Sequence, residues 1–318
     1  MPIPFVIRPC DTADLPAIVR LQQESQPLHP WSVEEVERGL RELEPHLRDH
    51  FLVAEHEGEL LGMADYLRPA GSYHPRRFHL HLCVASGHQG KGVGRALYEA
   101  TLRELEPLDP LSMTAQVRET DPRAVRFAQE RGFTEVKRDF ESILSLQDFD
   151  PESYRSLLDR LEQEGLRFRD FAELDSPDFR KRFHELFETL RVDVPRAEPP
   201  TPLTFEFFNK HVIEEPGMLP QAFVFALQGD ELLGFTGGYE GAAAGFMDTW
   251  LTAVSRTMRG RGVALALKVR SILAAKALGF TQARTDNDTR NAPMLRVNER
   301  LGFQRQPALI TVRKTFKA

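Results

Sequence analysis

QGKGVGRAL at residues 89–97 and RGRGVALAL at residues 259–267 are the two stretches that decide the fold. Each follows an apolar, strand-like run, and each leads into a segment of helical periodicity. The first N–H groups of a helix lack intrahelical partners and the helix dipole is positive there, so a glycine-rich turn before a helix suits a phosphate group. One copy alone could be only a tight turn. Two copies in the same context favour a bound pyrophosphate.

The two stretches belong to an internal repeat. A spacing of 170 residues separates Gly90 from Gly260 and Val84 from Val254, and ELLG recurs at a spacing of 172. Motifs that keep their order and spacing indicate a duplicated fold. We expect an N-terminal domain at 1–150, a connecting helix at 151–165 and a C-terminal domain at 166–318.

Each copy predicts the same order of elements: a strand, helices, three antiparallel strands, a helix, a strand, a helix and a last strand. This order indicates an α/β fold with a mixed sheet. The spacing excludes a Walker loop, which requires G-x-x-x-x-G-K-[ST]. It also disfavours a dinucleotide fold, because these glycines follow the fourth strand rather than the first.

The composition indicates a globular protein without a nucleic-acid partner. The chain has 318 residues, and its 41 Lys and Arg are outnumbered by 47 Asp and Glu. Cys10 and Cys83 are expected to be reduced thiols, because Cys83 lies in an apolar run. The sequence contains no apolar stretch long enough for a membrane helix and does not begin like an export signal. We therefore expect a cytoplasmic monomer or homodimer without a membrane partner.

Beyond these patterns, the sequence resembles a known family. The pattern V-x-x-x-x-[QR]-G-x-G-x-[GA], which starts at Val84 and at Val254, looks like the acyl-CoA loop of the GNAT superfamily of N-acetyltransferases. DPRAVRFAQERGF at 121–133 and NAPMLRVNERLGF at 291–303 resemble the helix that follows in that family. The resemblance covers nearly the whole chain twice and implies two tandem GNAT domains, loosely similar to the mycothiol synthases.

The resemblance implies acetyl-CoA as acyl donor. In GNAT folds the fourth and fifth strands splay apart, so that the fourth strand can bond the pantetheine arm while loop amides hold the pyrophosphate. The positions that match are Leu82, Cys83, Val84, Gln89, Gly90, Lys91, Gly92, Val93, Gly94, Thr252, Ala253, Val254, Arg259, Gly260, Arg261, Gly262, Val263, Ala264 and Asn291. Asp121 replaces the asparagine in the first copy, which weakens the match there.

Catalysis is expected in the second copy. Asp248 occupies the place of an acidic base on the strand, where the first copy has Phe78; the alternative is a solvated or salt-bridged carboxylate. The family's acid, a tyrosine, is replaced by Asn298 and by Ala128. Asn298 could donate a hydrogen bond to the sulfur, and Glu240 is a further candidate.

No metal site is expected. His79 and His81 share one face of a strand, but the sequence offers no third or fourth ligand, so strand packing or lining of a substrate cleft is the favoured role.

These observations predict an enzyme that transfers an acetyl group from acetyl-CoA to a primary amine of a small molecule. Chemistry is expected in the second domain, and CoA in the first would serve structure or regulation. Two alternatives remain open. One is acetylation of a protein N-terminus or lysine, and the other is a non-catalytic CoA-binding sensor or scaffold, suggested by the missing tyrosine.

Overall fold

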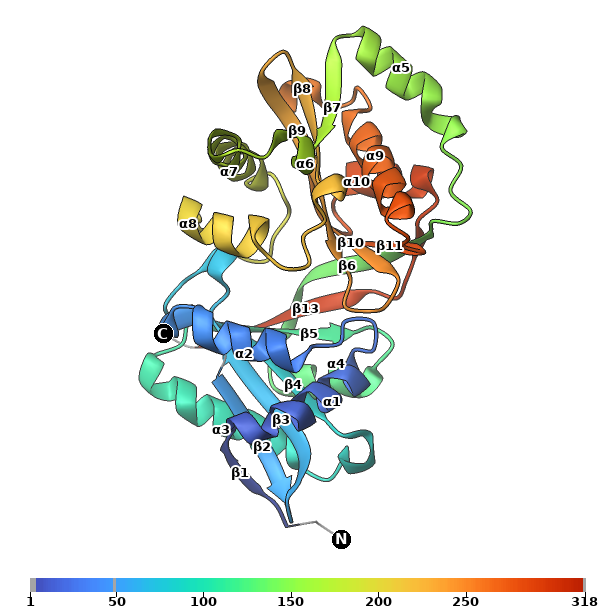
Figure 1. Cartoon of the computed structure of the whole chain (residues 1–318). Coiled ribbons are helices and arrows are strands. Elements are labelled where there is room, and N and C mark those ends of the chain that lie inside the picture. The colour runs from blue at the N-terminus through green and yellow to red at the C-terminus, as the bar shows by residue number, and fades with distance from the viewer. Residues whose placement is uncertain (1–3, 48–49, 317–318) are drawn as a thin grey trace. The chain divides into compact units, whose positions relative to one another are not determined.

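A computed structural model describes residues 4–47 and 50–316 (Figure 1). The chain forms two compact units. The N-terminal unit comprises residues 1–137 and 309–318, and the C-terminal unit comprises residues 138–308. No helix in the described residues is both long and apolar enough to cross a membrane.

The N-terminal unit is built on a mixed sheet in the order β1-β2-β3-β4-β5-β13. All neighbours are antiparallel except β4 and β5, which are parallel. The hairpin between β2 and β3 turns at Glu57 and Gly58, which both have positive φ. The strands and α-helices are β1 (Val6–Pro9), α1 (Leu15–Ser25), α2 (Val33–Glu42), β2 (His50–His56), β3 (Glu59–Leu67), β4 (Arg77–Val84), α3 (Val93–Leu105), β5 (Ser112–Arg118), α4 (Pro122–Glu130) and β13 (Leu309–Thr315).

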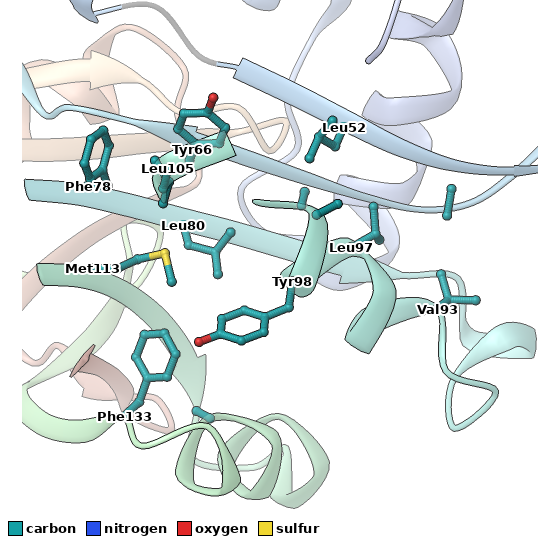
Figure 2. Packing of buried hydrophobic residues seen from close by; sticks show 14 of the residues in the cluster. Leu52, Tyr66, Phe78, Leu80, Val93, Leu97, Tyr98, Leu105, Met113 and Phe133 are labelled. Carbon is teal, nitrogen blue, oxygen red and sulfur yellow. The ribbon is translucent and has the colours of Figure 1, made fainter. Parts of the chain in front are cut away.

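Helices cover both faces of this sheet because its strands alternate two apolar sets. On β2, Leu52 belongs to the cluster around α3, whereas Phe51 and Val53 belong to the cluster around α1 and α2. Figure 2 shows the first cluster, in which Leu80 and Tyr98 lie between the sheet and the helices. The second face carries Cys83, and with it His79 and His81 at the same strand parity.

The C-terminal unit repeats this plan with the strand order β7-β8-β9-β10-β11-β6. Its parallel pair is β10 with β11. The strands and α-helices are β6 (Thr134–Ser145), α5 (Arg155–Gln163), β7 (Leu166–Asp170), α6 (Phe171–Leu174), α7 (Pro177–Arg191), α8 (Phe205–Phe208), β8 (Val224–Gln228), β9 (Glu231–Glu240), β10 (Phe246–Val254), α9 (Val263–Ala277), β11 (Gln282–Asp288), α10 (Ala292–Leu301) and β12 (Gln304–Arg305).

The two faces of the C-terminal sheet differ in chemistry. Aliphatic residues of α9, including Val269 and Ile272, pack on one face. The other face carries an aromatic cluster under α7 and α8, in which Phe183 lies edge-to-face against four other phenylalanine rings at 4.8–6.3 Å. Edge-to-face ring pairs of this kind add stability beyond the area that they bury.

The last strand of each sequence repeat belongs to the sheet of the other unit. β13, from the end of the second repeat, pairs antiparallel with β5, and β6, from the end of the first repeat, pairs antiparallel with β11 (Figure 1). The units therefore depart from the division at 150 and 166 expected from the sequence. The cause is strand pairing, since the last strand of each repeat satisfies its backbone groups in the sheet formed by the other repeat.

Candidate functional site

In both units the two parallel strands stop pairing with each other before the first of them ends. β4 pairs with β5 only from Arg77 to Leu80, although β4 continues to Val84. β10 pairs with β11 only from Phe246 to Asp248 and continues to Val254. The opposite edges of both strands stay paired, to β3 and β9. Each unit thus has an open strand edge of the kind to which an extended ligand can add.

This open edge contains the strand residues expected from the sequence. In the N-terminal unit they are Leu82, Cys83 and Val84, and in the C-terminal unit Thr252, Ala253 and Val254. β10 carries a bulge between Thr249 and Thr252, whereas the pairing of β4 with β3 is regular.

Both glycine loops have the same backbone geometry. Gly90 and Gly260 have φ of 77°, and Gly92 and Gly262 are left-handed N-caps of α3 and α9 with φ of 92° and 91°. Non-glycine residues rarely adopt this conformation. Val93 and Val263 are therefore the first residues of two helices, and the first N–H groups of a helix have no partner within the helix.

The loop of the C-terminal unit is surrounded by the protein's own carboxylates. Asp193 binds Arg256 at 2.6 Å and Arg259 at 2.5 Å, and these guanidinium groups hold the pKa of Asp193 far below its usual range. Glu164 binds Arg261 at 2.5 Å. The arginines that could meet a phosphate here are already paired with acidic side chains.

Helix α5 also covers part of this loop. A Cβ added at Gly262 would lie 2.8 Å from Leu157, and Arg160 donates a hydrogen bond to the carbonyl oxygen of Arg261. Beside this contact lies a concavity of about 430 Å³, lined by Ser156, Leu157, Arg160, Gly260, Arg261, Gly262 and Arg300. Ala264 follows on the first turn of α9 and packs on its apolar cluster.

The loop of the N-terminal unit is open by comparison. A Cβ added at Gly90 or Gly92 would meet no atom within 4 Å. Lys91 is exposed, and Gln89 joins the loop to α4 by accepting a hydrogen bond from Arg123 at 3.3 Å. Gly94 is on the first turn of α3. A Cβ added there would be in van der Waals contact with the side chains of Val84, Leu82 and Phe127.

Asp248 forms a bidentate ion pair with Arg284. Its two oxygens accept hydrogen bonds from Nε at 2.7 Å and Nη2 at 2.5 Å. Asp248 and Arg284 are also register partners, at the last pair before the strands diverge. The Arg284 side chain is only 1% exposed, whereas that of Asp248 is 32% exposed. This is the salt-bridged arrangement that the sequence left open as the alternative to a base.

Asn291 and Asp121 both act as helix N-caps. Asn291 accepts from the N–H of Met294 at 3.4 Å, and Asp121 accepts from the N–H groups of Arg123 and Ala124 at 3.0 Å. The substitution of asparagine by aspartate therefore preserves a cap, for which the two residues are equally suited.

The candidates for the acid lie in different settings. Asn298 is 2% exposed and donates to Asn287, and its Oδ1 has no hydrogen-bond partner in the part of the chain that is described. Glu240 is exposed at the end of β9. The neighbouring Tyr239 donates its hydroxyl to the carbonyl oxygen of Val212 at 2.7 Å, and burial raises the pKa of this phenol.

The structure also brings together a pair that the sequence analysis missed. His81 lies 3.0 Å from Asp65, a buried residue of β3. The sequence signal was the His-Leu-His run on β4 facing Asp65 across one hairpin, but only the strand register shows that they meet. Within residues 4–47 and 50–316, no group of three or more His, Cys, Asp or Glu side chains could hold a metal ion, and both cysteines are free thiols.

Comparisons with known proteins agree with this geometry. Residues 15–133 match the model of the Acetyltransferase (GNAT) family. A GCN5-related N-acetyltransferase from Sphaerobacter thermophilus has a similar structure over 99% of this chain and 98% of its own, with 22% identity and a TM-score of 0.74. A tandem GNAT protein from the clavulanic acid biosynthesis pathway is similar over 98% of both chains, with 18% identity and a TM-score of 0.72.

A third similar structure is a glucosamine N-acetyltransferase region of a fungal multi-domain β-N-acetylglucosaminidase. It covers 99% of this chain and 38% of that protein, with 15% identity and a TM-score of 0.74. No curated protein sequence matches the chain. Residues 15–133 thus form a GNAT acetyltransferase domain, and the whole chain has the fold of tandem GNAT proteins.

Proposed function

We propose that the protein transfers the acetyl group of acetyl-CoA to a primary amine of a small molecule, and that the N-terminal unit carries the reaction. The observation that supports this choice is the open glycine loop beside the diverging strands β4 and β5. This choice differs from the expectation that the second repeat is the catalytic one.

The N-terminal unit offers a group for each part of the donor. The N–H groups at Gly92 and Val93 and the dipole of α3 suit the pyrophosphate, with Lys91 and Arg123 beside them. The unpaired edge of β4 at residues 82–84 can form hydrogen bonds with the pantetheine amides, which would add to the sheet like a further strand. The thioester would then reach the point where the two strands separate.

The C-terminal unit is less suited to bind the same donor. Asp193 and Glu164 occupy its loop arginines, so acetyl-CoA would have to displace two carboxylates before its phosphates could bind. Asp248, the carboxylate next to its diverging strands, is engaged by a buried arginine. We propose that this unit is mainly structural.

A small acceptor is favoured by the side of the sheet that faces α1. There Trp31 and Gln26 lie against His81, so their side chains occupy space beside the diverging strands. The fungal structure of similar fold is named for glucosamine, a small amine. If the protein acetylates a protein N-terminus or a lysine instead, the proposed class of acceptor is wrong.

Release of CoA thiol with a panel of amines tests the proposal. Polyamines, amino sugars and amino acids represent small acceptors, and peptides with a free N-terminus or a lysine represent proteins. Turnover with a small amine is the expected result. Turnover with peptides alone would overturn the acceptor class, and tight binding of acetyl-CoA without any turnover would indicate a sensor.

Two matched variants test which unit binds the donor. Gly90 and Gly260 have the same φ, and neither has an atom within 4 Å of a new Cβ. Gly90→Asp and Gly260→Asp should therefore strain the two loops equally and place a negative charge against any bound phosphate. We expect Gly90→Asp to weaken acetyl-CoA binding at least about tenfold more, as measured by calorimetry. The opposite order would assign the donor to the C-terminal unit.

A further inference from the structure

The position of His81 sets it apart from the other histidines. It is the first residue of β4 beyond Leu80, the last residue of that strand to pair with β5. His81 therefore lies at the point where the strands open. The proposed acetyl transfer places the reacting thioester at this point.

A buried carboxylate orients the His81 ring. Asp65 is 2% exposed, and its Oδ2 lies 3.0 Å from Nδ1 of His81, with the two residues paired in register across β3 and β4. A carboxylate accepts hydrogen bonds, so Nδ1 carries the ring proton and Nε2 carries a lone pair. The amide nitrogen of Gln26, a donor, lies 3.5 Å from Nε2, which agrees with this assignment.

Two residues of the segment after α1, Gln26 and Trp31, contact the imidazole ring of His81. Gln22 is 1% exposed and donates to the carbonyl oxygen of His29 at 2.7 Å, while it accepts from the N–H of Trp31 at 2.9 Å. This clamp holds Trp31 with its ring centre 5.1 Å from that of His81. His81 remains 17% exposed, so a small molecule can reach it.

Asp65 contacts the ring directly, and the other titratable groups on this face are His79, Cys83 and Glu24. Burial lowers the pKa of His79, whose Nδ1 lies 3.1 Å from Thr114 on β5. Burial raises the pKa of Cys83 to about 12. Both are uncharged near neutral pH. The charge of Glu24, at the end of α1, also acts on this side of β4, where it raises the pKa of Cys83.

The C-terminal unit lacks both members of the pair. Gly62 pairs with Val84 as Gly234 pairs with Val254, so Asp65 corresponds to Gly237 and His81 to Leu251. Gly237 leaves no room for a side chain, because a Cβ there would lie 2.7 Å from Phe223 and 3.1 Å from Trp250. The pair is a feature of the N-terminal unit alone.

We infer that His81 is the general base of the N-terminal unit and that Asp65 is its positioning residue, acting on an ammonium substrate bound between Trp31 and Gln26. This assignment rests on the proposed acetyl transfer and names a base for it. The carboxylate keeps Nε2 free as acceptor and stabilises the imidazolium that forms.

The proton and bond changes balance without a further reactant. Nε2 takes one proton from the ammonium group and passes it to solvent, which leaves a neutral amine. The amine nitrogen bonds to the thioester carbon, and the carbon–sulfur bond breaks. The second proton lost from nitrogen ends on the leaving sulfur, which departs as CoA thiol.

Three variants test the base through the pH dependence of kcat/KM. His81→Gln should lower kcat/KM at pH 7 by about 100-fold or more, the usual contribution of a general base. Its rate should then rise with pH toward the titration of the amine itself, so that the deficit narrows at high pH. Asp65→Asn should lose less, because its amide oxygen can still accept from Nδ1. His79→Gln, the matched control on the same face of β4, should keep the wild-type pH profile.

Two results would overturn the assignment. If the wild-type protein is active and His81→Gln keeps its rate and pH profile, the base assignment fails while the acetyl transfer stands. If the wild-type protein acetylates no amine, the proposed function fails and the base falls with it. Nitrogen NMR of the wild-type imidazoles gives a readout that needs neither activity nor a variant: His81 should be protonated on Nδ1, and protonation on Nε2 would contradict the proposal.

Discussion

Asp248→Asn separates a structural carboxylate from a catalytic one. In the wild-type protein, both Asp248 oxygens accept from Arg284, whose side chain is 1% exposed. Removing one partner of a buried ion pair costs about 3–5 kcal/mol, because the other charge is left buried. Asn keeps one acceptor and about a third of the Asp248 side chain is exposed, so we expect a loss of about 2–3 kcal/mol.

Urea unfolding of the C-terminal unit measures this loss. The chain has two tryptophans, Trp31 and Trp250, so a Trp31→Phe background leaves a single fluorescent reporter in that unit. With a urea dependence of about 1–3 kcal/mol per molar, the midpoint should fall by about 1 M or more. The double variant Asp248→Leu/Arg284→Met should recover much of the stability, because it removes both charges.

Activity completes the test. At temperatures where Asp248→Asn stays folded, we expect kcat to remain within about threefold of the wild-type value, because the proposed base lies in the other unit. A stability loss below about 0.5 kcal/mol together with a large fall in kcat would refute this reasoning and return Asp248 to the role of base.

Three further predictions concern burial, backbone contact and the C-terminal loop. Burial of Lys268 lowers its pKa to about 7, so between pH 7 and 10.5 the unfolded chain holds a proton that the folded chain lacks. The free energy of unfolding should therefore rise with pH in this range. The variant Lys268→Met should be more stable than the wild type near pH 6, and urea unfolding should show this difference shrink by up to about 1.4 kcal/mol per pH unit above pH 7. Gly62→Ala should lower stability by about 1–3 kcal/mol in thermal unfolding, because its Cβ would lie 2.8 Å from the Cys83 carbonyl oxygen; an unchanged melting temperature would count against this contact. Asp193→Asn should free Arg256 and Arg259 and strengthen binding of pyrophosphate, measured by calorimetry in a Gly90→Asp background; unchanged affinity would mean that the carboxylate does not compete with phosphate.

The local parts of the fold could be predicted from the sequence. The sequence predicted three antiparallel strands in each copy and a helix after each glycine loop, and these helices begin at Val93 and Val263. These features depend on residues that are close in the chain, so pattern and conformational preference are sufficient. Gly92 and Gly262 have a left-handed φ, which explains why the motif has glycine at these positions.

The exchange of last strands could not be predicted in this way. β6 and β13 have equivalent places in the repeat, and either sheet offers an antiparallel partner for each. Strand patterns predict which face is buried but not which of two similar edges a strand joins. The choice depends on the connections of the whole chain.

The candidate site was predictable only in part. The loop positions follow from spacing, but the partner of each charged group does not. Arg284 is 36 residues from Asp248, and Asp65 is 16 residues from His81, so strand register brings each pair together. The carboxylate of Asp193 beside Arg259 likewise comes from a segment 66 residues away. These contacts moved the proposed chemistry from the second repeat to the first.

A structure of the protein with bound acetyl-CoA tests the central claim most directly. We predict the pyrophosphate at Gly90–92, the pantetheine arm along the open edge of β4, and the thioester at the point where β4 and β5 diverge, on the side of His81. Acetyl-CoA bound only at the C-terminal loop, with its thioester beside Asp248, would contradict the account.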